Sequence, residues 1–339
     1  MTTARRRVLI ALTALSGLTA ALLSSVLLIQ PPGPGPVGSV RNADLHELPG
    51  SDEEPWSVVV ISDVQNGHAY LPELLRRAGA CSPRAIVITG DLAPDPNPEL
   101  SRIPVWWLRR LPAPAPMFIV PGNHDLCACT GRRIGEREFL QWYGSLTFDF
   151  RIGRTRFIGL DNSTSPIVGA DLDSLRSKLE GAKARGERTL LWLHRNVVSF
   201  GDATLSLEAN PELQEMIRDY DVPYVICGHL HRDAFEESEG TRYAAMPASG
   251  HRPANDADQK PIAFMELRWD GRSFELRREE FYRRNLTELK GVFVYLALAK
   301  IQPMFHRRPI FASALVGACI FVAVAGAGLL WRRRKGDAC

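Results

Sequence analysis

The sequence has few cysteines, little net charge and no internal repeat, and each shortage excludes a class of protein. Six cysteines in 339 residues show no disulfide framework. The formal net charge is +3, but the basic ends (Arg5 to Arg7, and Arg332 to Lys335 less Asp337) contribute +6, which leaves −3 for the remainder. A weakly acidic bulk offers no basic surface to a phosphate backbone, so nucleic acid is not expected as a partner.

Two long stretches, 8–29 and 310–331, contain no charged residue, and arginine clusters border them at the chain ends. At about 1.5 Å per helical residue, each is long enough to cross a hydrocarbon core of roughly 30 Å. The positive-inside rule then places both termini in the cytoplasm. We therefore expect a two-pass protein of a bacterial plasma membrane. Its tails would be 1–7 and 332–339, its transmembrane helices 8–29 and 310–331, and its central part extracytoplasmic.

Two other interpretations of these stretches remain open. The first stretch resembles a cleaved signal peptide, although it is longer than the usual apolar core of about 7–15 residues and no small-x-small site closes it cleanly. Either interpretation exports the central domain. Both stretches also fit buried core helices, but core helices are rarely this long, uncharged and bracketed by arginines.

The part of the chain between the two stretches divides into three segments. Residues 30–55 are rich in proline, glycine and acidic side chains, which predicts a spacer. Residues 56–285 have a globular pattern. Residues 286–309 predict a juxtamembrane segment, in which Gly291–Ile301 is either an interfacial helix or a last strand.

The globular segment alternates short apolar runs with helical patterns, which predicts an α/β fold. Buried strands are expected at Ser57–Ile61, Ala85–Thr89, Met117–Val120, Thr189–Leu193 and Tyr224–Cys227. Helices are expected at Leu71–Gly79, Ala170–Ala184 and Pro211–Tyr220. Further strands at Thr147–Arg151, Arg156–Leu160, Tyr243–Met246, Ile262–Trp269 and Ser273–Arg277 would form hairpins, so the sheet should be mixed.

Five short blocks carry side chains that bind metals, and each follows an apolar run closely. They are Asp63-Val64-Gln65, Gly90-Asp91, Gly122-Asn123-His124-Asp125, a single His194, and Gly228-His229-Leu230-His231. Each block alone also fits a turn, a helix cap or a strand end. A hydrolytic two-metal site needs oxygen and imidazole ligands, with one carboxylate bridging ions about 3.5–4 Å apart. In α/β sheets such ligands gather beyond the carboxyl ends of strands, so the ordered set predicts convergence.

In this order the blocks resemble the calcineurin-like metallophosphoesterases, whose pattern is D-x-H, G-D, G-N-H-[DE], H and G-H-x-H. The resemblance implies one metal held by Asp63, Gln65, Asp91 and His231, and a second held by Asp91, Asn123, His194 and His229. It implies attack on phosphorus by a hydroxide that bridges the ions. His124, oriented by Asp125, would stabilise the phosphoryl group or protonate the leaving oxygen. It also implies a sandwich of two mixed β-sheets flanked by helices.

The chain departs from that pattern at Gln65, where the family usually has histidine. An amide oxygen is a harder and weaker ligand than imidazole, so we predict two divalent ions with Mn²⁺ preferred, and with Mg²⁺, Fe or Zn²⁺ as alternatives. D-x-Q is typical of two subgroups of the family. One comprises soluble manganese-dependent ADP-ribose and CDP-alcohol diphosphatases. The other comprises secretory-pathway enzymes that remove phosphoethanolamine from lipid anchors and usually show Asp-Pro-Gln.

These observations favour a membrane-tethered phosphoesterase that acts on a lipid-linked or membrane-proximal phosphate ester, with the lipid bilayer as a partner. Arg195 follows His194 and is a candidate phosphate clamp, although a solvated arginine is the plainer interpretation. Two alternatives remain open. One is a nucleotide diphosphatase, and the other is a non-catalytic scaffold that binds metals.

Overall fold

The computed structural model describes residues 3–42, 46–127, 133–164, 166–202, 211–251, 261–283 and 285–307, with 314, 318, 321 and 324. The chain forms two compact units. One unit is Pro32–Gly291, and the other combines Met1–Pro31 with Val292–Cys339. Each unit is described by itself below.

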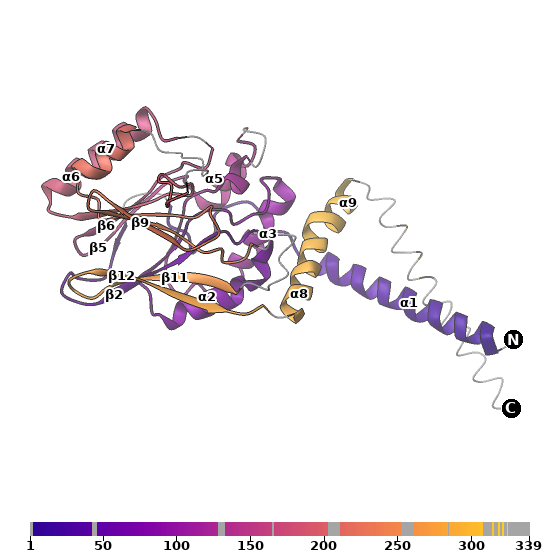
Figure 1. Cartoon of the computed structure of the whole chain (residues 1–339). Helices are drawn as coiled ribbons and strands as arrows, with labels where there is room; N and C mark the ends of the chain where they lie inside the picture. Colours follow the sequence, from indigo (N-terminus) through magenta and orange to yellow (C-terminus); the bar gives the residue numbers. More distant parts are fainter. Residues whose placement is uncertain are drawn as a thin grey trace. The chain divides into compact units, whose positions relative to one another are not determined.

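Two mixed β-sheets build the larger unit (Figure 1). The first has the order β12-β11-β2-β3-β4, with β2 (Trp56–Ile61), β3 (Ala85–Ile88), β4 (Met117–Ile119), β11 (Ile262–Trp269) and β12 (Phe274–Phe281). The second has the order β1-β5-β6-β7-β8-β10-β9, with β1 (His46–Leu48), β5 (Phe148–Ile152), β6 (Thr155–Gly159), β7 (Arg188–Trp192), β8 (Tyr224–Cys227), β9 (Ala234–Ser238) and β10 (Thr241–Ala245).

The parallel strands of each sheet end at the same edge, so the loops that follow them lie close together. In the first sheet β2, β3 and β4 are parallel, and β11 runs antiparallel to β2. In the second sheet β6, β7, β8 and β10 are parallel. The expected mixed-sheet sandwich is therefore confirmed. Each predicted strand is present within a few residues, except that β12 extends four residues beyond its expected end.

The continuous apolar runs form strands because both of their faces are buried. The sandwich core combines side chains of both sheets, including Val58, Val87, Phe118, Phe157 and Trp192. The opposite face of the second sheet packs against two helices in a separate cluster. Strands buried on both sides have no polar alternation, which explains the sequence pattern.

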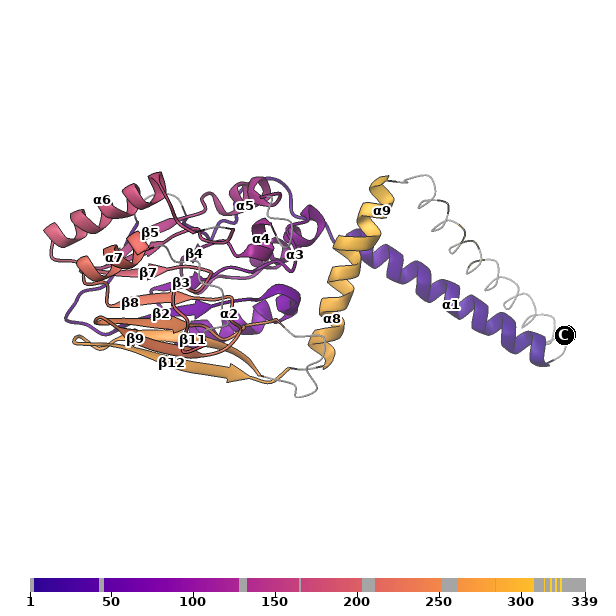
Figure 2. The ribbon, with the colours of Figure 1, turned by 45° about the horizontal axis from the view of Figure 1, so that its top comes forward.

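Helices cover the outer faces of the sandwich. They are η1 (Gln65–Tyr70), α2 (Leu71–Ala80), α3 (Pro98–Leu108), α4 (Asn123–Leu126), α5 (Glu136–Tyr143), α6 (Ala170–Ala184) and α7 (Pro211–Asp219). The helices α6 and α7 lie along the second sheet, with Leu172, Leu175 and Leu179 on the buried face of α6. Figure 2 shows α3, α4 and α5 grouped at one end of the sheets.

The second unit contains α1 (Thr3–Leu28), which covers most of the first uncharged stretch, together with η2 (Leu296–Ile301) and α9 (Gln302–Arg307). The boundary between the units falls within α8 (Asn285–Tyr295), after Gly291. Gly291–Ile301 is helical throughout, so the strand alternative is wrong. Within the described residues, no helix combines the length and apolarity needed to span a bilayer. Most of the expected span 310–331 lies outside those residues.

Most of the stretch 30–55, which the sequence predicts to be a spacer, belongs to the larger unit, which begins at Pro32. Val37 and Asn42 are buried, and β1 pairs with β5. The side chain of Asn42 accepts the backbone N–H of Ile119 at 2.8 Å and donates to the carbonyl oxygen of the same residue. The polar composition of this stretch suggested an unpacked linker. The amide of Asn42 instead makes the backbone hydrogen bonds that a neighbouring strand would make with β4.

We predict that Asn42→Ala lowers the free energy of unfolding by about 1–3 kcal/mol, because it leaves a buried backbone N–H and C=O without partners. Denaturant unfolding of the full-length chain measures the change. Gln141→Ala, which removes an exposed amide from α5, is the control and should stay within about 0.5 kcal/mol of the wild type. An equal effect of both substitutions would show that residues around Asn42 do not stabilise the larger unit.

Candidate metal centre

The structure brings all five blocks to the carboxyl ends of the central strands. Asp63 follows β2, Asp91 follows β3 and Asn123 begins α4 after β4, all from the first sheet. His194 follows β7 and His229 follows β8, both from the second sheet. The site is therefore built where the two sheets meet, as the strand-end argument predicts.

The backbone of the site is held in an unusual conformation. Nine described residues other than glycine have positive φ, and five of them are predicted ligands: Asp63, Gln65, Asp91, His229 and His231. Left-handed backbone is unfavourable for residues with a Cβ, at about 1–3 kcal/mol each, and it concentrates at functional sites. The cost persists because cross-strand hydrogen bonds fix these turns, such as Asp63 N–H to the carbonyl oxygen of Gly90 at 3.2 Å.

Asp63, Asp91 and His231 place ligand atoms within 4.8 Å of one another. Asp63 is fully buried; its Oδ2 accepts the backbone N–H of His229 at 3.1 Å, and its Oδ1 lies 3.0 Å from Nε2 of His231. Burial alone would raise the pKa of Asp63, but the contact with His231 is the main cause that lowers it overall. Burial alone would lower the pKa of His231, and the bond to Asp63 raises it instead.

The carboxylate of Asp91 lies at the centre of the group. Its Oδ2 accepts from Nε2 of Gln65 at 2.8 Å, and its Oδ1 accepts from the backbone N–H of His124 at 2.8 Å. The same Oδ1 is 3.5 Å from Nε2 of His194. A Cβ at Gly122 would collide with this carboxylate, which explains the glycine of the third block.

The Nε2 atom of His194 faces oxygen atoms that also accept hydrogen bonds. Its Nδ1 faces the carbonyl oxygen of Thr89 at 2.8 Å, which only accepts, so Nδ1 carries the proton. In the neutral ring, Nε2 is then an acceptor, and it lies 3.0 Å from Oδ1 of Asn123. Burial is the main cause that lowers the pKa of His229, to about 3, so its ring also keeps a lone pair near neutral pH.

These contacts fit divalent cations. Nε2 of His194 and the side-chain oxygens of Asn123 and Asp91 converge as lone-pair atoms, and a cation between them would satisfy all three. At the other end of the group, Nε2 of His231 lies 3.0 Å from Oδ1 of Asp63, so an imidazole nitrogen and a carboxylate oxygen face each other where a cation would bind. The donor set of carboxylate, amide oxygen and imidazole suits hard and borderline ions.

One detail of the expected chemistry is wrong. Asp125 does not orient the ring of His124, because its carboxylate accepts the backbone N–H groups of Ala93 and Gly122, each at 2.9 Å. Nδ1 of His124 faces the carbonyl oxygen of Pro94 at 3.0 Å instead. Asp125 thus fixes the loops around the site, and burial, with the nearby charge of Asp91, raises its pKa to about 6.

Arg195 lies beside the site, but its guanidinium is not simply solvated. Its Nε donates to the carbonyl oxygen of Ser163 at 2.9 Å, and its backbone N–H donates to Oδ1 of Asn162 at 3.0 Å. Asn162 also accepts the backbone N–H of His194 at 2.9 Å. A role for Arg195 in binding phosphate stays a prediction.

His251, which the sequence patterns did not indicate, lies against the predicted ligands. Its ring centroid is 4.1 Å from that of His231, and its Nδ1 contacts Oε1 of Gln65. Burial and the charge of His231 lower the pKa of His251 to about 4. The only sequence signal is a Gly-His pair shortly after β10, which is too short to identify without the fold.

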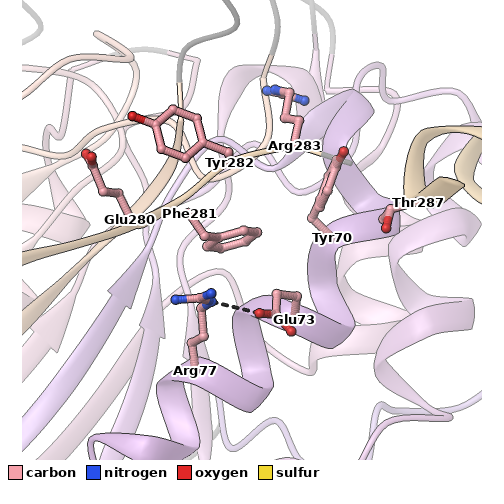
Figure 3. Close-up of a pocket in the computed structure, with 8 residues that line it drawn as sticks. All are labelled: Tyr70, Glu73, Arg77, Glu280, Phe281, Tyr282, Arg283 and Thr287. Atoms are coloured by element: carbon pink, nitrogen blue, oxygen red, sulfur yellow. Dashed lines mark hydrogen bonds and ion pairs between the residues drawn. The ribbon is translucent and has the colours of Figure 1, made fainter. Parts of the chain in front are cut away.

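A cavity of about 470 Å³ lies close to this histidine loop. Figure 3 shows Arg283 near the ring of Tyr70 at the rim of this cavity, with Arg77 and Glu73 paired below. Arg283 also donates to the carbonyl oxygens of Gly250 and His251, at 2.9 and 3.1 Å. The cavity lining therefore supports the loop that carries His251.

A two-sheet α/β sandwich with acidic and imidazole ligands at its strand ends defines a metal-dependent hydrolase. The sequence profile of the calcineurin-like phosphoesterases matches residues 57–233, which is more than half of the chain. The chain therefore belongs to this family and is a metal-dependent phosphoester hydrolase. No curated protein sequence matches the chain.

Solved structures share the fold. A dimetal phosphatase from Danio rerio is 15% identical with a TM-score of 0.52, over 67% of this chain and 98% of that one. A purple acid phosphatase from yellow lupin seeds is 14% identical with a TM-score of 0.52, over 71% of this chain and 56% of that one. At this level of identity the likeness concerns the fold alone.

We predict that Asp91→Asn weakens metal binding by more than the roughly 10–100-fold that loss of an outer-shell partner costs, because it removes the charge of the carboxylate that is predicted to be shared by two ions. Calorimetric titration with Mn²⁺ measures this. Asp95→Asn, in the same loop, is the control. The carboxylate of Asp95 accepts the backbone N–H of Asn97, so this substitution should leave metal binding unchanged. Retention of two tight sites in Asp91→Asn would refute the shared-ligand assignment.

Proposed function

We propose that this chain hydrolyses a phosphate ester at a membrane surface with two bound divalent ions. The observation that carries the proposal is the position of Asp91, whose carboxylate oxygens face Gln65 on one side and His194 on the other. The two ligand sets are those that the family resemblance implies: Asp63, Gln65, Asp91 and His231 for one ion, and Asp91, Asn123, His194 and His229 for the other.

Bound metals would lower the pKa of a water enough to provide a nucleophile near neutral pH, and would supply positive charge for the phosphoryl oxygens. Mn²⁺ is our preferred ion, because Gln65 offers a hard amide oxygen in place of an imidazole. The remaining chemistry belongs to the protein. His124 is the best-placed acid, since its backbone is fixed by Asp91 and its Nδ1 by the carbonyl oxygen of Pro94.

With Nδ1 engaged, Nε2 is the atom of His124 that a bound phosphate would meet. We therefore expect His124→Ala to lower kcat by about 10²–10⁴-fold, the usual contribution of a general acid or base. Mn²⁺ affinity should stay unchanged, because the backbone N–H, and not the ring, contacts Asp91. Steady-state kinetics and calorimetry on the same preparation test both statements. An unaltered kcat would exclude His124 from the reaction.

The substrate class is tested on the full-length chain loaded with Mn²⁺. The panel is a phosphomonoester, a phosphodiester, ADP-ribose, a CDP-alcohol and a phosphoethanolamine-bearing lipid, each compared with the Asp91→Asn variant. Turnover of the lipid substrate above the others supports our proposal. Preference for ADP-ribose or the CDP-alcohol would favour a nucleotide diphosphatase, and two bound metals without any turnover would favour a scaffold.

The membrane part of the proposal rests on sequence and on one surface feature. The uncharged stretches 8–29 and 310–331, each next to an arginine cluster, are typical of membrane segments. On α8, Leu286 and Leu289 are 79% and 66% exposed, and they lie three residues apart on one helix face. Exposed leucines at this spacing fit a helix that rests in a lipid interface.

We predict that the full-length chain stays in the membrane pellet after alkaline carbonate extraction, whereas residues 32–291 alone are recovered in the supernatant. The apolar terminal segments supply the difference, because burial of each CH₂ group in lipid contributes about 0.8 kcal/mol. Immunoblotting of both fractions reads the result. Release of the full-length chain by carbonate would refute the tether without affecting the hydrolase assignment.

A further inference from the structure

A short segment, Ser249 to His251, is joined to the first metal-binding block as firmly as a neighbouring strand. The backbone N–H of Ser249 donates to the carbonyl oxygen of Ser62 at 2.7 Å, and that of His251 donates to the carbonyl oxygen of Asp63 at 2.9 Å. The hydroxyl of Ser249 accepts the N–H of Ser62 at 3.1 Å and donates to the carbonyl oxygen of Ala263 at 2.7 Å. The backbone of His251 is thereby tied to a predicted ligand residue.

Two glycines make this contact closer than side chains allow. A Cβ at Gly67 would collide with the backbone of Gly250, and a Cβ at Gly250 would collide with the carbonyl oxygen of Val64. Arg283 holds the segment from the other side through the carbonyl oxygens of Gly250 and His251. The imidazole of His251 is consequently placed by rigid backbone rather than by a free loop.

The ring of His251 is one end of a chain of polar contacts that leads to the centre. Its Nδ1 contacts Oε1 of Gln65, and Nε2 of Gln65 donates to Oδ2 of Asp91 at 2.8 Å. The carboxylate of Asp91 only accepts, so the NH₂ group of Gln65 faces it. The amide oxygen then faces His251, whose Nδ1–H donates to it. A flip of this amide would instead place its oxygen against the Asp91 carboxylate, and neither of those groups has a proton to donate.

We propose that His251 is a positioning residue of the metal centre, which holds the amide of Gln65 with its oxygen fixed in the place of the missing family histidine. The inference rests on the proposed two-metal function. An amide group has one end that binds a cation and one that repels it, whereas either nitrogen of an imidazole can bind. A glutamine in this block therefore needs a partner that selects the oxygen, and His251 is that partner.

The test compares three substitutions of His251 in the full-length chain. His251→Asn keeps an N–H group where Nδ1 stands, His251→Gln keeps polar atoms where Nε2 stands, and His251→Ala keeps neither. We expect Ala and Gln to weaken one of the two Mn²⁺ sites by roughly 10–100-fold, the usual cost of an outer-shell partner. Asn should stay within about threefold of the wild type, a difference below 1 kcal/mol. Calorimetric titration and electron paramagnetic resonance of bound Mn²⁺ are the readouts.

A second background isolates the role of the amide. In Gln65→His the ligand is an imidazole and has no oxygen to select, so adding His251→Ala should change Mn²⁺ affinity by less than about threefold. His46→Asn, on β1 outside the site, controls for loss of an imidazole. Thermal unfolding of the metal-free variants shows whether each one folds.

Three results would overturn the proposal. Rescue by Gln but not by Asn would make His251 a direct ligand through Nε2. Wild-type affinity in His251→Ala would show no role at all. Full additivity of Gln65→His and His251→Ala would show that the two residues act independently. These readouts need no substrate. If two Mn²⁺ sites depend on His251 but no substrate is turned over, the proposed function is refuted and the role of His251 is supported.

Discussion

The carboxylate of Asp91 is the interaction on which the rest of the site depends. It comes from the first sheet, it accepts hydrogen bonds from Gln65 and His124, and it lies 3.5 Å from Nε2 of His194, which comes from the second sheet. Its buried charge has no arginine or lysine among the partners that the structure describes. A buried carboxylate without a basic partner is costly, and bound cations are the natural compensation.

The packing of the sandwich offsets the free energy that the strained backbone of the site costs. Five predicted ligands have left-handed backbone, which opposes folding locally. The two sheets oppose that cost with a shared apolar core and with backbone hydrogen bonds between strand ends, such as Gly228 N–H to the carbonyl oxygen of His194 at 3.0 Å. Substrate binding sites of this kind sit on rigid elements for the same reason.

The sequence predicted those parts of the structure that have a strong periodic or ordered signal. Continuous apolar runs identified the buried strands, and leucines at helical spacing identified α6. Edge strand β9 was missed because it is mostly exposed and carries Glu236 and Glu237 without apolar alternation. Helix α3 was missed because Pro104 lies within it, although Asn97 caps it and Pro98 begins it.

The site shows the same division between ordered signals and tertiary contacts. The seven predicted ligands lie close together because the loops that carry them follow strands whose ends meet at one edge of the sandwich. The role of Asp125, the packing of Asn42 and the placement of His251 depend on backbone groups far away in sequence, which no local pattern records. A polar side chain that satisfies the backbone looks like an ordinary loop residue until the fold is known.

The pairing of β2 with β11 has a consequence for how the protein is made. The first metal-binding block follows β2, but the strand that covers one edge of β2 begins only at Ile262, and Ser249 reaches back to Ser62 from just before it. During synthesis β2 therefore waits with one open edge until roughly 200 further residues have left the ribosome, at about 5–20 residues per second. An uncovered apolar strand invites pairing with other chains. The late arrival of β11 thus leaves the strand that carries the first metal-binding block exposed to such pairing for most of the synthesis of the domain.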